Sequence, residues 1–293
     1  MPTAYELVTE SIIKQLESGV APWRKPWRTE PPANLVSKKE YRGINVFLLA
    51  SQGYGSRYWL TYRQAQTVGG NVKKGEHGFK VVLWKIDEYQ KRNTTTGQLE
   101  DHKSILLRYY TVFNVEQCEG IKFPDPPPPI HSIEQCGSIV RSMPHPPAFV
   151  QEGQACYRPS IDTVGMPALS AFHSAEEYYS TLFHELTHST GHPTRLAREG
   201  ILKHNPFGSE DYSKEELVAE MGAAMLCGVA GIESQTLGNS ASYLQSWISR
   251  LKSDSRLVVS AAAQAQKAAD YILGKATVEI ESDAKGGNES EIL

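Results

Sequence analysis

Apolar residues recur at helical spacing in the first part of the chain. Residues 5–19 place leucine and isoleucine on one face of a helix, and Gly19 follows as a stop signal. The apolar run 44–54 predicts a helix or a buried segment, and residues 60–70 predict a short helix closed by glycines.

A strand pattern follows these helices. Residues 79–90 and 105–117 are rich in β-branched and aromatic side chains. The polar, turn-rich residues between them predict a hairpin loop. The first half of the chain is therefore expected to be α+β.

The second half is mainly helical in pattern. An extended strand over 155–172 is expected to lead into a helix over 174–191 that opens with a Ser-x-x-Glu capping box. A further helix is expected over 211–231, and the alanine-rich stretch 240–273 predicts one or two more.

Prolines separate the two patterns. The run 123–132 cannot continue a helix or a central strand, because each proline lacks the amide donor. The expected organisation is a first domain over 1–123, a proline-rich linker with one short helix over 124–149, a second domain over 150–282 and a flexible tail over 283–293.

Charge divides at the same boundary. The whole chain has a net charge of −3. Residues 1–123 hold 18 Lys and Arg against 12 Asp and Glu, a net charge of +6, whereas residues 124–293 hold 12 against 21, a net charge of −9. The basic half is the natural surface for a polyanion, and the acidic half argues against a long nucleic-acid path across it.

Composition narrows the class of protein. With 40% hydrophobic and 22% charged residues, the chain has the composition of a globular protein. No stretch approaches the roughly 20 apolar residues of a membrane helix, and the first residues do not resemble a signal peptide, so we expect a cytoplasmic protein without a membrane partner. The four cysteines form no CxxC pair and are expected to be mostly buried thiols.

The sequence HELTH at 184–188 is the strongest chemical signal. His184 and His188 are four residues apart on one helix, so both imidazoles face the same side and can bind one Zn²⁺ or another divalent metal such as Mn²⁺. Glu185 is the expected catalytic glutamate, because in such sites it takes a proton from a water whose pKa the metal has lowered.

A catalytic zinc usually has a third protein ligand. His192 follows His188 by four residues, but Gly191 and Pro193 end the helix there. The metallopeptidase subclass with the pattern HExxHxxGxxH would have a histidine at position 194, but this chain has Thr194 there.

The next helix offers better donors. Glu216 is the favoured third ligand, with Glu220 and Glu215 as alternatives. Glu220 is the expected carboxylate that accepts the second ring N–H of a ligating histidine. The competing interpretation is that Glu216 only caps its helix through Ser213 and that Glu215 is solvated.

Three tyrosines near these helices are candidate oxyanion donors, although packing in the core is the favoured interpretation for each. They are Tyr178, Tyr179 and Tyr212.

Aromatic and basic residues alternate in the first half. Bases stack on aromatic rings while Lys and Arg contact phosphates when proteins bind single strands without reading sequence. Zinc-finger and basic-zipper patterns for duplex DNA are absent. The competing interpretation buries the tryptophans in the core. The candidate DNA-binding residues are Trp23, Arg24, Lys25, Trp27, Lys38, Lys39, Tyr41, Arg42, Lys73 and Lys74.

The order of these motifs resembles a known family. IIKQLESGVAPWRKPW, YRGINVFLLAS and the VVLW strand resemble the domain that ArdC antirestriction proteins share with conjugative primases of TraC type. YRPSIDTVGMP, HELTHSTGH and YSKEELVAEMGAAML in the second half also resemble ArdC proteins.

The resemblance implies an α+β domain that binds single-stranded DNA and a mainly helical, zincin-like metallopeptidase domain. It favours His184, His188 and Glu216 as metal ligands and Glu185 as the catalytic glutamate. The function it implies is that of a plasmid-encoded protein that protects incoming DNA from host restriction during conjugation. The alternative function is a DNA-targeted metalloprotease that cleaves a restriction enzyme or another DNA-bound protein.

Overall fold

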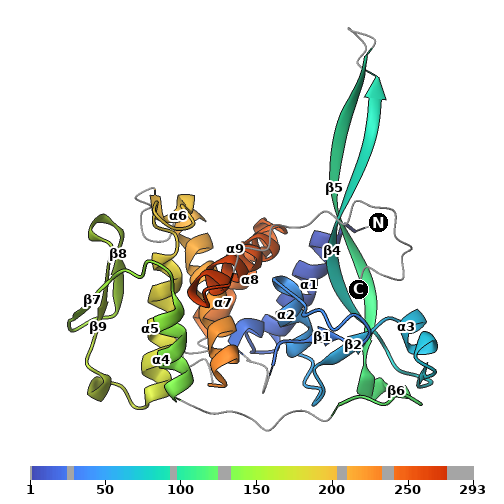
Figure 1. The fold of residues 1–293 in the computed structure, drawn as a ribbon, viewed down its shortest axis with the longest axis horizontal. Helices are drawn as coiled ribbons and strands as arrows, with labels where there is room; N and C mark the ends of the chain where they lie inside the picture. The colour runs from blue at the N-terminus through green and yellow to red at the C-terminus, as the bar shows by residue number, and fades with distance from the viewer. Residues whose placement is uncertain are drawn as a thin grey trace.

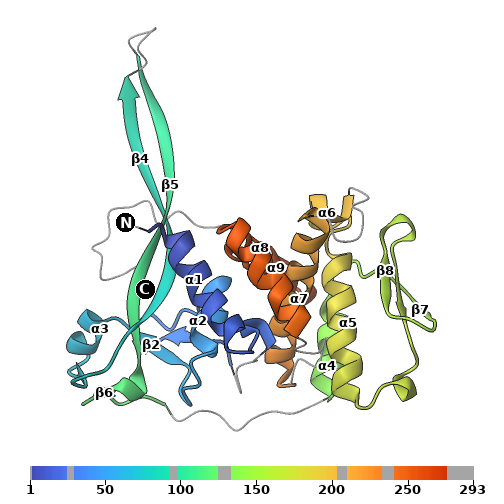
Figure 2. The ribbon, with the colours of Figure 1, turned by 180° about the vertical axis from the view of Figure 1, so that it is seen from behind.

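The computed structural model of the 293-residue chain describes residues 2–24, 30–92, 98–124, 133–202, 210–232 and 241–275. Its elements form a row of layers, with a sheet near each end and helices between them (Figure 1 and Figure 2). The predicted α+β class is confirmed.

The first half begins with the three predicted helices. Thr3 caps the first of them, because its side chain accepts from the Glu6 amide while the Glu6 carboxylate accepts from the Thr3 amide. In chain order the elements are α1 (Ala4–Glu17), η1 (Pro22–Arg24), β1 (Ala33–Asn34), α2 (Ile44–Ala50), β2 (Tyr58–Leu60), α3 (Tyr62–Thr67), β3 (Asn71–Val72), β4 (Phe79–Arg92), β5 (Leu99–Asn114), η2 (Val115–Gln117) and β6 (Cys118–Glu119).

The predicted hairpin is the largest feature of the first sheet, whose strand order is β1-β2-β5-β4. β4 and β5 pair antiparallel from Phe79 opposite Val112 to Arg92 opposite Leu99. Both strands are longer than predicted, because the pairing continues through the polar residues at the far end. The β4–β5 hairpin projects beyond the rest of the molecule, and we call it the arm (Figure 1).

The second half contains several long helices, a small sheet and some short elements. In chain order these are α4 (Ile133–Ser142), β7 (Ala148–Gln151), β8 (Cys156–Arg158), η3 (Pro159–Ile161), β9 (Thr163–Met166), η4 (Leu169–Ala171), α5 (Ala175–Ser189), α6 (Glu199–Leu202), α7 (Glu210–Ala230), α8 (Ala241–Ser253) and α9 (Leu257–Ile272). α4 is the short helix that was predicted within the linker.

The prediction of one extended strand over 155–172 is wrong. Strand pairing ends at Arg158, because Pro159 starts a 3-10 turn and has no amide to donate. The chain reverses through Asp162, whose φ is 47°, and returns as β9. β9 therefore lies in the middle of the sheet, whose order is β7-β9-β8.

The two halves share one apolar core. Val8, Ile12 and Leu16 on α1 belong to the same buried cluster as Leu244 and Ile248 on α8. α7 lies inside this cluster, which explains why it is apolar over most of its surface. The core therefore joins the regions that the sequence assigns to separate domains.

Within the described ranges, no helix combines the length and the apolar character that crossing a membrane requires.

Ile12→Ala tests the shared core. Ile12 is fully buried between the halves, so we expect the free energy of unfolding to fall by about 2–5 kcal/mol. Val20→Ala is the control, because Val20 is 42% exposed and should change this free energy by less than about 0.5 kcal/mol. Urea unfolding followed by fluorescence and circular dichroism should show one transition that shifts as a unit. Two separate transitions, of which only one shifts, would contradict the shared core.

Candidate metal centre

Two adjacent helices position the candidate metal ligands. α5 begins at Ser174, whose hydroxyl accepts from the Glu177 amide at 3.1 Å. Leu182 and Leu186 anchor the helix in the core. α5 packs directly against α7, so the polar residues of both helices meet at their contact.

Three side chains converge there. The Nε2 atoms of His184 and His188 are 3.1 Å apart. Glu216 on α7 lies with one carboxylate oxygen 3.6 Å from the His184 Nε2 and the other 3.5 Å from the His188 Nε2. One ligand atom from each residue lies within 4.8 Å of the others, and within the described ranges this is the one group of His, Cys, Asp and Glu side chains arranged to hold a metal.

Glu215 holds the ring of His188 from behind. Its carboxylate lies 3.3 Å from the His188 Nδ1, on the side away from the cluster. Arg198 binds both oxygens of the same carboxylate, and Glu215 and Arg198 are both buried. The competing interpretation of a solvated Glu215 is therefore wrong, because Arg198, just before α6, lies over this part of α7.

The surrounding carboxylates favour the charged form of His188. Burial alone would lower its pKa, but the hydrogen bond to Glu215 and the charges of Glu216, Glu215 and Glu185 raise it to about 9. The carboxylates around His188 therefore stabilise a positive charge at this site.

Glu220 has a different role from the predicted one. Its carboxylate accepts hydrogen bonds from the Trp23 indole N–H, at 2.8 Å, and from the Tyr243 hydroxyl. Burial raises the Glu220 pKa, and these two donors oppose the shift. The His184 Nδ1 is buried without a hydrogen-bond partner among the described residues. The carboxylate beside a ring's second nitrogen is therefore Glu215, not Glu220.

The capping interpretation of Glu216 is also wrong. α7 begins at Glu210, so Ser213 lies within the helix instead of at its start. The Glu216 carboxylate faces the two histidines.

The donor set fits a divalent metal. Two imidazole nitrogens and one carboxylate are a common set for catalytic zinc and also suit manganese. Glu185 lies next to His184 and is 8% exposed. The arrangement can therefore hold a cation beside a carboxylate that is able to accept a proton.

The remaining candidates lie outside the cluster. His192 follows the end of α5, and its Nδ1 contacts the Thr194 hydroxyl at 2.8 Å. Tyr178 and Tyr179 pack against the core, as the favoured interpretation had it. The side chain of Tyr212 lies outside the described residues.

A second ion pair fixes the end of α5. Arg195 binds Asp162 of the small sheet and donates to the Ser189 carbonyl at 2.7 Å. Burial raises the Asp162 pKa, but the hydrogen bonds from Arg195 and Tyr157 outweigh it and lower the pKa. The small sheet is thereby tied to the helix that carries the histidines.

Two aromatic residues predicted to stack on DNA are buried. Trp23 is 1% exposed and bonds Glu220, and Tyr41 is 9% exposed and packs with Trp59. Neither ring can stack on a base, because helices and strands cover both. Burial was the competing interpretation for Trp23.

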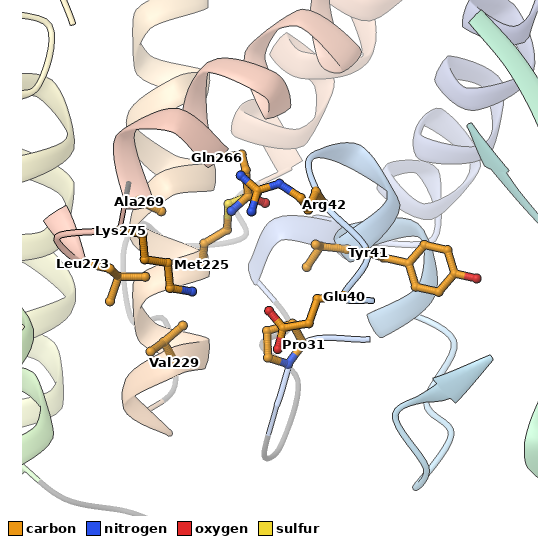
Figure 3. A pocket seen from close by; sticks show the side chains of 11 residues that line it. Pro31, Glu40, Tyr41, Arg42, Met225, Val229, Gln266, Ala269, Leu273 and Lys275 are labelled. Carbon is orange, nitrogen blue, oxygen red and sulfur yellow. The ribbon is translucent and has the colours of Figure 1, made fainter. Parts of the chain in front are cut away.

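The basic candidates lie in different surroundings. Arg42 pairs with Asp270 and reaches toward Gln266 across a pocket between the halves, while the ring of Tyr41 points away (Figure 3). Lys73 donates to the Glu116 carbonyl at 2.8 Å. The exposed candidates are Lys38, Lys39, Lys73 and Lys74. Lys25, Trp27 and the side chain of Arg24 lie outside the described residues.

Sequence reasoning missed Arg198 and Tyr243 at this site. Neither has a spacing signal, because each reaches the site from a separate element. Glu215 did carry a weak signal, since it neighbours Glu216 on a helix facing HELTH.

Arg198→Ala tests the support of the cluster. The change leaves the buried Glu215 carboxylate without its cation, so the free energy of unfolding should fall by about 3–5 kcal/mol. Arg63→Ala on the exposed surface of α3 is the control, with an expected change within about 0.5 kcal/mol. Thermal and urea unfolding of both variants would measure this. Equal stability of the two variants would show that the Arg198 pair is not needed.

Comparisons with known proteins agree with this geometry. Residues 2–113 match the N-terminal domain of the anti-restriction factor ArdC, and residues 147–264 match a zincin-like metallopeptidase family. Two DNA primases TraC of Escherichia coli are 38% identical over 92% of this chain, which spans only 27% and 20% of their length. The uncharacterized protein y4eC of Sinorhizobium fredii is 35% identical, with 92% of this chain and 91% of that protein covered.

Two solved structures of an ArdC protein are also similar to this chain. The metal-free antirestriction ArdC protein of the R388 plasmid is 38% identical with a TM-score of 0.74, covering 92% of this chain and 96% of that one. Its Mn(II)-bound structure is 37% identical with a TM-score of 0.72, covering 92% and 97%. This likeness over nearly the whole of both chains, with both domain matches in the same order, shows that the chain belongs to the ArdC family of antirestriction proteins.

Proposed function

We propose that this protein binds single-stranded DNA and protects incoming DNA from host restriction endonucleases during conjugation, and that its second half binds a divalent metal. The proposal places DNA binding in residues 1–123 and the metal in residues 150–282, in a plasmid-encoded, cytoplasmic protein. The observation that carries the metal part is the convergence of His184, His188 and Glu216.

The metal is Zn²⁺ or Mn²⁺ in this proposal. The donor set suits both, and a related ArdC protein has been solved with Mn(II). Glu215 fixes the ring of His188 so that its Nε2 faces the other two donors. The ring of His188 is thus oriented before any metal binds.

Glu185 is the residue for proton transfer in this site. A bound divalent metal supplies Lewis-acid activation of a water or a carbonyl. Glu185 lies beside the ligands, largely buried, where its carboxylate can take up a proton and pass it on. Glu220 lies one helical turn beyond Glu216, and the Trp23 indole and Tyr243 hydroxyl hold its carboxylate.

The DNA part is supported by charge and by family. The first half carries a net charge of +6, and Lys38, Lys39, Lys73 and Lys74 are exposed on it. The ArdC N-terminal domain covers this half, and the TraC primases match it as well. Nonspecific phosphate contacts of this kind dominate the affinity of such proteins.

A metalloprotease that cleaves a DNA-bound protein, such as a restriction enzyme, is the second candidate function. The position of Glu185 beside the three ligands favours it. Glu185→Gln separates the two candidates, because it removes the proton acceptor and keeps the ligands.

For Glu185→Gln we expect unchanged metal affinity and unchanged protection of conjugated DNA in a restricting recipient. Metal affinity is measured by competition with a chelating dye, and protection by transconjugant frequency. Glu134→Gln is the matched control, because Glu134 is exposed on α4. Loss of protection with metal affinity intact would favour the metalloprotease instead.

Replacing Lys38 and Lys39 together by alanine should weaken binding of single-stranded DNA. The logarithm of the binding constant falls linearly with the logarithm of the salt concentration. Each lost phosphate contact should make this slope shallower by about 0.7, because fewer counterions are released. Fluorescence anisotropy at several salt concentrations measures both effects. Lys14→Ala with Lys252→Ala is the control pair, since both lysines are paired with glutamates on α1. An unchanged slope would place these two lysines off the DNA path.

A further inference from the structure

We propose that the single strand stacks on an aromatic strip at the base of the arm, formed by Tyr109, Trp84 and Tyr5 and flanked by Lys80 and Arg256. This inference rests on the proposed DNA binding and specifies the surface that performs it. The three rings take the stacking role that the sequence suggested for Trp23 and Tyr41, both of which are buried.

The arm brings two of the rings to one face. Val82 pairs with Tyr109 and Trp84 pairs with Leu107, so Tyr109 and Trp84 are diagonal neighbours on the same side of the ribbon. Tyr109 is 46% exposed and Trp84 is 37% exposed. Large aromatic rings half open to solvent on adjacent strands form a platform on which flat groups can stack.

The third ring comes from α1, which lies beside the base of the arm (Figure 2). The Tyr5 ring packs edge-on against Trp84, with centroids 6.1 Å apart and planes at 67°. Helix and arm therefore place the three rings side by side at the base of the arm. This contact also braces the arm, which matters because an isolated two-stranded ribbon has little stability of its own.

Cations close the strip at both ends. The Lys80 Nζ lies 4.9 Å from the centre of the Tyr109 ring, and the Arg256 Cζ lies 5.5 Å from that of Tyr5. Arg256 immediately precedes α9, so both halves of the protein contribute. Lys80 and Arg256 are exposed and can reach a phosphate while they remain beside the rings.

The nearby acids are occupied with backbone groups. The Glu6 carboxylate accepts from the Thr3 amide at 2.7 Å, and the Asp254 carboxylate accepts from the Arg256 amide at 2.8 Å. In the strand register, the four acidic positions of the hairpin, 87, 88, 100 and 101, come after the pair of Trp84 and Leu107 toward the far end. The strip therefore combines rings and cations in the way that suits single-stranded nucleic acid better than an acidic or purely apolar partner.

Tyr109→Ala is the direct test, with full-length protein and a labelled oligothymidine in fluorescence anisotropy. Removing one stacking ring should raise Kd about 5- to 100-fold. Tyr109→Phe should stay within about twofold of wild type, because the ring remains. Tyr62→Ala is the matched control, since Tyr62 is 48% exposed on α3 in the same half.

Arg256→Ala is a second test that leaves the strands of the arm unchanged. We expect this variant to bind the oligonucleotide with a higher Kd and a shallower salt dependence. Photocrosslinking of an iodouracil oligonucleotide to the wild-type protein should label Tyr109, Trp84 or Tyr5. This experiment does not depend on the folding of any variant.

The outcomes separate this inference from the proposed function. If the wild type binds the oligonucleotide but Tyr109→Ala and Arg256→Ala behave like Tyr62→Ala, the strip is not the DNA site, although DNA binding stands. If the wild type binds no single strand, the proposed function fails, and this inference fails with it. If Tyr109→Ala loses protection in cells while its Kd is unchanged, the strip binds a protein and the DNA assignment is overturned.

Discussion

The contact between α5 and α7 is the constraint on which the rest of the structure depends. It brings two imidazoles and several carboxylates into a buried space, where unpaired charges would be strongly destabilising. Arg198 offsets Glu215, Glu215 orients His188, and Glu216 faces both histidines. Among the buried polar atoms of this site that the structure describes, the His184 Nδ1 is the one without a hydrogen-bond partner, and the Nε2 atoms of the two histidines lie 3.1 Å apart.

The two halves are joined at this same site. Trp23 belongs to the basic half by sequence, but its indole binds Glu220, one helical turn from Glu216. Its ring also packs against Trp247 of α8. A change in the first half can therefore reach the candidate metal ligands through a short buried path. The opposite net charges of the halves, +6 and −9, describe different surfaces of one packed body.

Local patterns in the sequence predicted the elements and part of the site. The HELTH spacing fixed the two histidines on one helical face, and the third predicted donor, Glu216, lies beside them. Residues that act through tertiary packing were not predictable. Nothing near Trp23 or Tyr41 in sequence shows that distant helices and strands cover them, and Arg198 approaches Glu215 from another element. The choice between Glu215 and Glu220 depended on the rotation of α7, which spacing alone does not fix.

X-ray absorption at the zinc edge of the zinc-loaded, full-length protein tests the central claim most directly. Two imidazoles and a carboxylate predict a first shell of nitrogen and oxygen at about 2.0–2.1 Å, with the outer-shell scattering of two histidine rings. A sulfur shell near about 2.3 Å, or a shell without imidazole scattering, would contradict a site built from His184, His188 and Glu216.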